Sequence, residues 1–342
     1  MNMKKIRLGD VATYVNGYAF KPSDRGEKGL PIIRIQDLTG NAYDLGFYDG
    51  DYPKRVEINN GDILISWSAS LGVYIWNQGK ALLNQHIFKV VFDKVDINKY
   101  YFVFAVKHNL NLMESKAHGA TMKHIVKKDF DNTLIPYPSL QEQEKIAFSL
   151  SKVSQIIDQR QQELDKLDEL VKARFVELFG DSEQNPRGLP VLPWSKVFLT
   201  TTGKLDSNAM VENGQYPFFT CAKESFWIDT YAFDCEALLL AGNNAAGVYD
   251  VKHYKGKFNA YQRTYVLRLI NDQWSYKLFK RQLEDKLRYL QSQSKGTNTR
   301  YLTLGILNEL RFVVPPVAEQ EQFAAFVEQT DKSKVAVQKE FI

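Results

Sequence analysis

The stretch PSLQEQEKIA at residues 138–147 recurs 177 positions later as PPVAEQEQFA at residues 315–324. Two other pairs of blocks share this offset without gaps, and a third pair joins them after a three-residue slip. These pairs are GATMKHI at 119–125 with GTNTRYL at 296–302, QHIFKV at 85–90 with QRTYVL at 262–267, and GDILI at 61–65 with CEALL at 235–239. Such a set indicates an internal duplication, which predicts two copies of one structural unit.

The residues after each proline block predict a helix. Residues 141–179 contain no Gly or Pro, and a helix of about 39 residues would run roughly 58 Å. Its apolar positions alternate between spacings of four and three, which is typical of a coiled coil that needs a partner helix. They are Ile146, Leu150, Val153, Ile157, Leu164, Leu167, Val171 and Leu178, with Arg160 and Arg174 at the two missing positions, either solvated or paired with acids of the partner. The expected partner is residues 319–342, whose seam is shorter and more polar.

The chain is therefore predicted to consist of two globular domains and two helical segments. The boundaries are 1–138 for the first domain, 139–180 for the first spacer helix, 181–315 for the second domain and 316–342 for the short second helix. Short β-branched and aromatic runs in the domains predict strands. The fold class is thus α/β: two mixed, strand-rich globular domains separated by long antiparallel coiled-coil helices, in a tandem repeat with pseudo-twofold symmetry.

Composition excludes several classes of protein. With 342 residues, 44% hydrophobic and 13% aromatic, the chain can bury cores and is not predominantly disordered. Two cysteines are too few for a disulfide framework, and the five histidines show no metal-ligand spacing, so no metal site is expected. No apolar run is long enough for a membrane span, and the N-terminus lacks a signal peptide. We expect a soluble, cytoplasmic protein.

The net charge alternates along the chain, from +4 for residues 1–138 and −2 for 139–180 to +4 for 181–315 and −2 for 316–342. The two globular domains are therefore expected to face a polyanion, and the helices are not. Two domains held apart by a rigid helix pair suit a long ligand with two separated half-sites. Duplex DNA fits because half-sites on one face recur at about 34–36 Å or multiples of it.

At this level the chain resembles the specificity subunit of type I restriction–modification systems. The resemblance rests on the Pro-x-Leu-x-Glu-Gln pattern, which stands at residues 138–143 and, with Val for Leu, at 315–320. The start of each domain is also typical of that family, as IRLGDVA at 6–12 and, more weakly, LPWSKV at 192–197. The match covers nearly the whole chain, and the duplicated set is specific in combination.

The resemblance implies a non-catalytic subunit. In this family each target-recognition domain reads one half of a bipartite double-stranded DNA site, and the helices set the spacing and bind two modification subunits. S-adenosylmethionine, ATP and Mg²⁺ are expected on the modification and restriction subunits, and no cofactor on this chain. The second helical region departs from the family, with about 27 residues against about 42 in the first. Either the C-terminus is truncated or self-association through this helix completes the bundle.

Three groups of residues are candidates for DNA contact. The first lies in matched Gly-led basic turns, where Gly permits close backbone approach and Thr, Asn, Lys or Arg can reach phosphates. Its members are Gly119, Thr121, Lys123 and His124, with Gly296, Thr297, Asn298 and Arg300. The alternative is a turn with solvated basic residues.

The second group enters a predicted strand in each repeat, and Gln or Arg there can make bidentate bonds to adenine or guanine. Its members are Asn84, Gln85 and His86, with Tyr261, Gln262 and Arg263. The alternative is a strand entry at which Gln caps a turn. The third group consists of small polar loops after a buried strand, with one further loop residue. Its members are Ser66 and Ser68, with Asn243 and Asn244, and Arg34.

Two other classes of function remain as alternatives. A self-sufficient DNA methyltransferase would need a motif such as Asn/Asp-Pro-Pro-Tyr/Phe, and the sequence has none. A nuclease or ATPase would need a phosphate-binding loop or a metal-binding acidic cluster, and no defensible one occurs, so no catalytic residue is predicted. A coiled-coil sensor of a small ligand survives only if the basic charge is incidental. Salt-dependent retention on a DNA column would separate it from a DNA reader.

Overall fold

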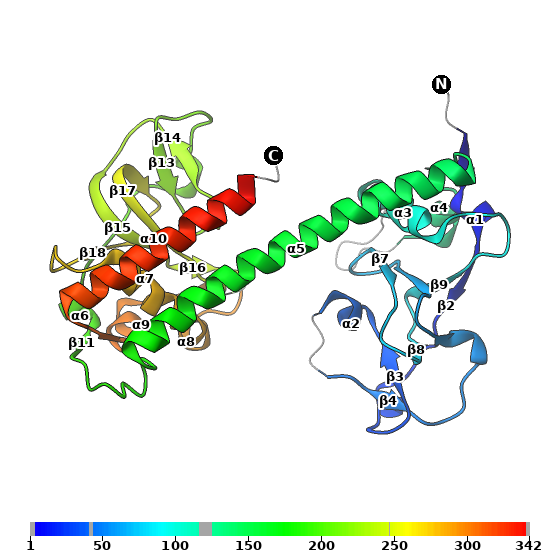
Figure 1. Ribbon diagram of the computed structural model, residues 1–342, viewed down its shortest axis with the longest axis horizontal. Coiled ribbons are helices and arrows are strands. Elements are labelled where there is room, and N and C mark those ends of the chain that lie inside the picture. The colour runs from blue at the N-terminus through cyan, green and yellow to red at the C-terminus, as the bar shows by residue number, and fades with distance from the viewer. Residues whose placement is uncertain (1–3, 41–43, 116–124, 246, 340–342) are drawn as a thin grey trace. The chain divides into compact units, whose positions relative to one another are not determined.

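The structure is a computed structural model that describes residues 4–40, 44–115, 125–245 and 247–339 (Figure 1). The chain divides into two compact units, residues 1–158 and 159–342. The boundary falls inside the longest helix, α5 (Leu140–Phe179), which contains 40 residues as its unbroken sequence pattern predicted.

In the first unit, the strands form one two-stranded and two four-stranded sheets. The orders are β1 (Lys5–Arg7) with β10 (Leu134–Pro136); β2 (Thr13–Asn16), β9 (Ile87–Val91), β6 (Ile63–Ser66) and β7 (Gly72–Ile75); and β4 (Phe47–Tyr48), β3 (Leu30–Ile33), β8 (Ala81–Leu83) and β5 (Glu57–Ile58). The helices are α1 (Leu8–Val11), α2 (Ile35–Thr39), α3 (Lys99–Ser115) and α4 (Lys127–Asp131), with 3₁₀ turns at Pro22–Asp24 and Lys54–Val56.

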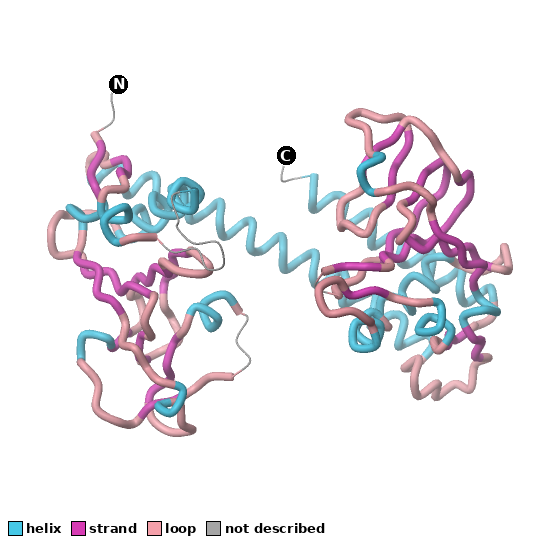
Figure 2. Tube along the Cα trace, turned by 180° about the vertical axis from the view of Figure 1, so that it is seen from behind, coloured by secondary structure: helices cyan, strands magenta, loops and turns pink. Residues whose placement is uncertain are grey.

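In the second unit, a single six-stranded sheet replaces the two four-stranded ones (Figure 2). Its order is β12 (Phe198–Thr202), β18 (Thr264–Leu269), β15 (Phe233–Ala241), β17 (Val251–Ala260), β13 (Tyr216–Phe219) and β14 (Phe226–Ile228). Two small ladders pair β11 (Val191–Pro193) with β20 (Arg311–Val313) and β16 (Asn243–Asn244) with β19 (Arg300–Tyr301). The helices are α6 (Trp194–Val197), α7 (Tyr276–Asp285), α8 (Leu287–Gln293), α9 (Leu304–Asn308) and α10 (Val317–Lys339), with a 3₁₀ turn at Ser207–Ala209.

The strand registers confirm the duplication and correct one alignment. Ser66 pairs with Ile87, and Ala241 pairs with Thr264 at the same place in the second unit. Because Ile87 and Thr264 are 177 positions apart, Ser66 matches Ala241, and the slip is two residues where the sequence alignment used three. The apolar pattern could not set this register, since every residue of β6 is buried and no polar face marks it.

One buried glutamine per repeat explains why the proline block recurs. Gln143 accepts a hydrogen bond from the backbone N–H of Asn98 (2.9 Å) and donates one to the carbonyl of Pro138 (3.0 Å). The same two bonds recur 177 positions later, at 3.0 and 2.8 Å, between Gln320, Ser275 and Pro315. Both glutamines are completely buried, so each ties the start of a long helix to the residue that precedes α3 or α7.

The second unit packs the end of α5 against α10. Phe323 of α10 lies 5.7 Å from Phe175 and 5.8 Å from Phe179, measured between ring centroids. Further along α10, the Lys334 ammonium group pairs with the Asp168 carboxylate (2.5 Å). Residue numbers rise along one helix as they fall along the other, so this pair is antiparallel, as predicted.

Only some of the residues predicted to form the apolar seam of α5 pack against other parts of the protein. Phe175 and Phe179 carry the contact with α10, although neither stood in the four–three pattern. The Arg174 guanidinium lies 5.7 Å from the Phe326 ring centroid and pairs with Glu177 of its own helix (2.8 Å), so it is neither simply solvated nor paired with an acid of α10. Three seam residues in the first half are exposed: Leu150, Val153 and Ile157.

Candidate nucleic-acid interface

In the second unit the structure brings the three candidate groups together. The carbonyl of Arg263 accepts a hydrogen bond from the N–H of Gly242, and the carbonyl of Gly242 accepts one from the N–H of Leu302 (2.8 Å each). These bonds join the loop after β15, the entry to β18 and the segment that contains β19. An open pocket of about 530 Å³ lies where they meet, lined by Asn243, Tyr261, Gln262, Arg263, Thr299 and Tyr301.

The polar side chains at this pocket differ in how firmly they are held. Gln262 donates through its amide to the Asp206 carboxylate (2.9 Å). Arg300 reaches the backbone carbonyl of Gln291 (3.3 Å) but is otherwise exposed, as is Arg263. Gly296 begins the turn before β19 with φ = +96°, a conformation that a side chain would strain, and Thr297 and Asn298 follow it in exposed positions.

A second, more apolar hollow adjoins the first and was not predicted from the sequence. It has a volume of about 400 Å³, and Tyr261 lines both hollows. Its other walls are Ser207, Asn208, Met210, Thr220, Cys221, Ala222 and Phe226. These residues come from three separate segments, so no single local pattern marks the hollow as a whole. In such an arrangement the polar groups can bond to base edges, and the apolar surface can contact the thymine methyl group.

The first unit repeats the backbone arrangement. The carbonyl of His86 accepts from the N–H of Trp67 (3.2 Å), and the carbonyl of Trp67 accepts from the N–H of Ile125 (3.0 Å). Trp67 therefore matches Gly242 in position. Four candidates of the matching turn lie outside the described residues: Gly119, Thr121, Lys123 and His124.

His86 is held in an unusual conformation at this edge. Its backbone has φ = +71°, in the left-handed region that a histidine adopts only at a cost. Its ring packs edge-on against Trp67 at 4.9 Å, and its Nδ1 atom is buried with no hydrogen-bond partner among the residues that the structure describes. Beside it, Asn84 accepts a bond from the N–H of Gln85 (2.9 Å), whose own side chain is exposed.

The remaining candidates are less available than predicted. Ser66 and Ser68 are buried, and the Ser66 hydroxyl donates to the carbonyl of Ser70 (2.6 Å). Arg34 lies next to Asn84, because the carbonyl of Ile33 accepts from the Asn84 N–H (3.0 Å). Its guanidinium is occupied locally by Asp37 (3.2 Å) and by Asp44 (3.6 Å). In the second unit Asn243 and Asn244 are half-buried in the β16–β19 ladder.

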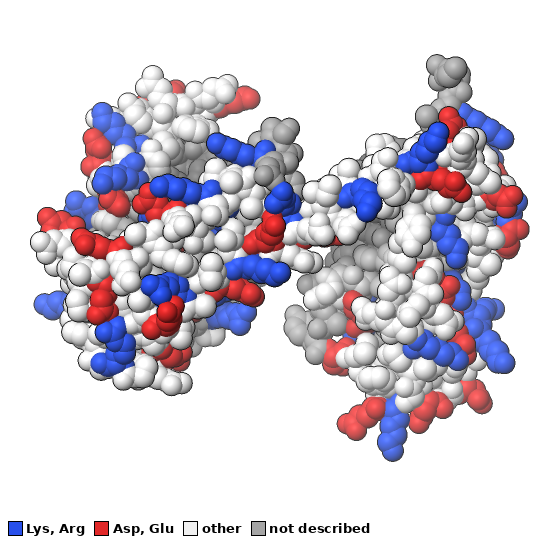
Figure 3. Space-filling model, viewed as in Figure 1, with Lys and Arg blue, Asp and Glu red and all other residues white. Residues whose placement is uncertain are grey.

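The charged side chains that the structure describes do not form a continuous patch of positive charge on the face drawn in Figure 3. Lys and Arg alternate there with Asp and Glu over both units. Within the described part of the chain, no group of three His, Cys, Asp or Glu residues could hold a metal ion. Nor does any helix that the structure describes have the length and hydropathy needed to cross a membrane.

Fold and candidate interface together define a duplicated two-unit protein, in which each unit builds one loop edge from the same three segments. A family profile described as "Type I restriction modification DNA specificity domain" matches residues 1–169 and again residues 197–341. The chain belongs to this family, and the resemblance drawn from its sequence is confirmed.

Particular relatives agree with this assignment. The chain is 41% identical over 126 residues to the type I restriction enzyme EcoDI specificity subunit of Escherichia coli, covering 36% of this chain and 27% of that protein. It is 30% identical over 171 residues to the EcoBI specificity subunit of the same organism, covering 49% and 36%. The matched regions thus span well under half the length of these relatives.

A solved structure shares the fold. The S subunit of the type I restriction–modification system from M. genitalium superposes with a TM-score of 0.63 at 15% sequence identity. The superposition covers 99% of this chain and 92% of the other. The predicted fold class, two strand-rich α/β repeats with a long helix, is therefore confirmed.

Proposed function

We propose that this chain is the sequence-specificity subunit of a type I restriction–modification complex, and that each repeat reads one half of a bipartite double-stranded DNA site. The observation that carries the proposal is that the same three segments meet twice, joined by the same pair of backbone hydrogen bonds. Loops held on a rigid sheet edge can present variable side chains to base edges without altering the fold. The family membership supports the same reading.

The proposal assigns the chemistry to partner subunits. Two modification subunits would bind along the helices and use S-adenosylmethionine, and restriction subunits would use ATP and Mg²⁺. Self-association through α10 and a cytoplasmic location, where the DNA lies, belong to the same proposal. The purified chain, freed of other subunits, is expected to show no methyltransferase, nuclease or ATPase activity, and turnover that copurifies with it would contradict this.

The test is a domain exchange read by mapping methylated sites in a host that carries the chain and its modification subunit. Residues 1–138 are replaced by the first domain of another specificity subunit. One half of the bipartite methylated site should change and the other should stay as it was. A matched exchange of residues 181–315 should give the reciprocal result. A change in both halves from either exchange, or in neither, would contradict independent reading.

The spacing role of the helices needs a separate experiment. Inserting four residues near Arg160 lengthens an α-helix by about 6 Å, close to two base-pair steps, and nearly keeps the helix phase. The non-specific spacer of the methylated site should lengthen by roughly one or two base pairs, with both half-sites intact. A two-residue insertion rotates the helix by roughly 200° and should damage assembly. If the variant with four inserted residues is active and its spacer is unchanged, α5 does not set the spacer length.

A further inference from the structure

A second concave site lies in the second unit, apart from the candidate DNA loops. It is a pocket of about 690 Å³ formed by the end of α5, the start of β17, α7 and α10. Six cationic side chains line it: Lys172, Lys252, Lys277, Lys280, Arg281 and Lys334. The acidic lining residues are Asp168, Glu284 and Asp331, and three further carboxylates contact lining cations from outside the pocket: Asp250 contacts Lys252, Asp285 contacts Arg281 and Glu328 contacts Lys277.

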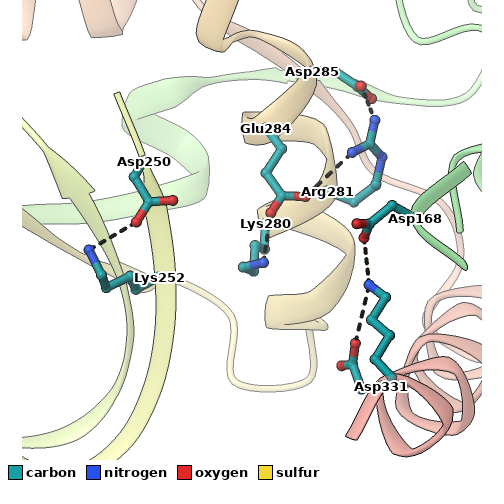
Figure 4. A network of polar contacts seen from close by, with 9 residues as sticks. Asp168, Asp250, Lys252, Lys280, Arg281, Glu284, Asp285 and Asp331 are labelled. Carbon is teal, nitrogen blue, oxygen red and sulfur yellow. Dashed lines mark hydrogen bonds and ion pairs between the residues drawn. The ribbon is translucent and has the colours of Figure 1, made fainter. Parts of the chain in front are cut away.

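Two of the six lining cations, Lys172 and Lys277, have no close ion pair with a described carboxylate. Lys334 pairs with Asp168 (2.5 Å). Figure 4 shows Lys280 paired with Glu284 (2.6 Å) and Lys252 paired with Asp250 (2.9 Å). Lys277 has a longer contact of 3.6 Å with Glu328 at the rim. Lys172 makes no ion pair with any residue that the structure describes.

The Arg281 side chain supplies an independent sign of a missing acceptor. It is nine-tenths buried, with a side-chain exposure of 10%. Its terminal nitrogens contact Glu284 and Asp285, yet its Nε atom is buried with no hydrogen-bond partner among the described residues. Leaving a buried donor unpaired is costly. An oxyanion in the pocket would give this N–H an acceptor.

The first repeat shows that the fold does not require these charges. The glutamine contacts that tie α3 to α5 and α7 to α10 align the two helices at the offset of 177. At that offset Tyr100, Val103 and Phe104 stand where Lys277, Lys280 and Arg281 stand in the second repeat. The same helix position is therefore built from apolar side chains in one repeat and from cations in the other.

We propose that this pocket binds a small polyphosphate, a ligand with several phosphate groups in a chain. Lysines and a guanidinium that converge from four elements match an extended row of oxyanions, and the volume exceeds what one phosphate fills. The His253 imidazole is the one aromatic ring among its described lining residues, and it already stacks on Tyr276 at 5.4 Å. Recognition would therefore rest on the phosphate chain and not on stacking of a base. This site is independent of the proposed DNA reading and would stand or fall alone.

The test uses the full chain and inorganic tripolyphosphate as probe, measured by isothermal titration calorimetry at low salt. One molecule should bind per chain, and affinity should fall as salt rises. The double variant Lys277→Ala, Lys280→Ala should weaken binding about a hundredfold, since each of the two charge-assisted bonds contributes roughly tenfold. A control variant, Lys257→Ala with Lys295→Ala, removes the same charge from exposed positions outside the pocket and should bind as the parent does.

Further arms distinguish the outcomes. Arg281→Met tests the buried donor, and circular dichroism confirms that each variant is folded. Absence of tripolyphosphate binding by the folded parent, or equal weakening in the control, would overturn the proposal. So would a result in which the Lys277, Lys280 variant loses affinity only for non-specific duplex DNA, because the pocket would then serve the DNA backbone.

Discussion

The two repeats share a set of recurring contacts but build different sheets around it. We call this set the frame: the buried Gln143 or Gln320 with its two hydrogen bonds, and the pair of backbone hydrogen bonds at the loop edge. In the first, the chain between β7 and β8 breaks at Trp76, whose indole donates to the carbonyl of Gly79 (2.6 Å), and two four-stranded sheets result. In the second, the corresponding chain continues as β17 through Gly256, which has φ = +135°, and one six-stranded sheet results. The two copies of the duplicated sequence have thus diverged in their sheets while keeping the same glutamine and backbone hydrogen bonds.

The difference shows which contacts define the repeat. The buried glutamines and the backbone bonds at the loop edge recur with the same partners, whereas the side chains presented there differ. His86 in the first repeat corresponds in position to Arg263 in the second, and the buried Ser68 corresponds to the half-buried Asn243. Stability therefore depends on the frame, and any reading of DNA would depend on residues that the frame leaves free to vary.

Loss of a frame glutamine should have the largest effect. Gln320→Leu leaves the N–H of Ser275 and the carbonyl of Pro315 unpaired in a buried site, and should lower the free energy of unfolding by about 2–4 kcal/mol. Gln143→Leu should do the same in the first unit. Urea unfolding measures both, with Gln322→Leu as the control because Gln322 is exposed on the same helix. Equal losses in all three variants would contradict the shared frame.

Loss of a reading side chain should act on one repeat alone. Arg263→Ala should reduce discrimination at one base pair of one half-site by roughly 10- to 100-fold, since a bidentate base contact contributes about 1–3 kcal/mol. The other half-site should be unaffected. Binding of the assembled complex to a series of single-base variants measures this. Arg268→Ala, an exposed arginine further along β18, is the matched control, and an equal effect from it would remove Arg263 from the interface.

Loss of a phosphate contact should weaken binding to all sequences equally. Arg300→Ala in the second repeat, and Lys123→Ala in the matching turn of the first, should each reduce the slope of log K against log salt by about 0.9. The measurement is a salt titration of DNA binding by the complex. Lys332→Ala on the exposed side of α10 should leave the slope as it was. If the two turn variants also leave it unchanged, the turns are structural.

The smallest expected effect is a pH dependence that comes from one histidine of the second repeat. Burial lowers the pKa of His253, although the hydrogen bond between its Nε2 atom and the accepting Glu236 carboxylate (2.9 Å) opposes the shift. Since the unfolded chain binds this proton at about pH 6.5 and the folded chain only at lower pH, stability should fall as pH decreases below about 6.5. The first repeat has Ile75 at the matching ladder position.

The variant His253→Gln removes the titrating group and can keep a bond to Glu236. Its free energy of unfolding should vary less between pH 7 and pH 5 than that of the parent. His108→Gln, at an exposed position on α3, serves as the control. A parent and a His253→Gln variant with the same pH profile would show that His253 does not contribute.

Much of the fold could be predicted because its signals are periodic or repeated. The unbroken run 141–179 marked α5 to within a residue, and the offset of 177 marked two of the three segments that meet at each loop edge. The third segment, the loop after β6 or β15, was aligned one residue out of register. The seam was less accurate, because Phe175 and Phe179 pack on α10 through ring geometry that a four–three pattern does not encode. The contact of the candidate residues with DNA stays a prediction.

The sequence by itself determined that this chain is a duplication with a long helix after the first proline block, and which family it resembles. These features are local or periodic, and they can be read without knowing what packs on what. Only the tertiary structure decided that one repeat splits its sheet, that Tyr261 stands between a polar and an apolar hollow, and that cations from four elements share a pocket. Those features join residues tens of positions apart, such as Lys252 and Lys334, whose proximity depends on long-range packing that leaves no trace in their spacing.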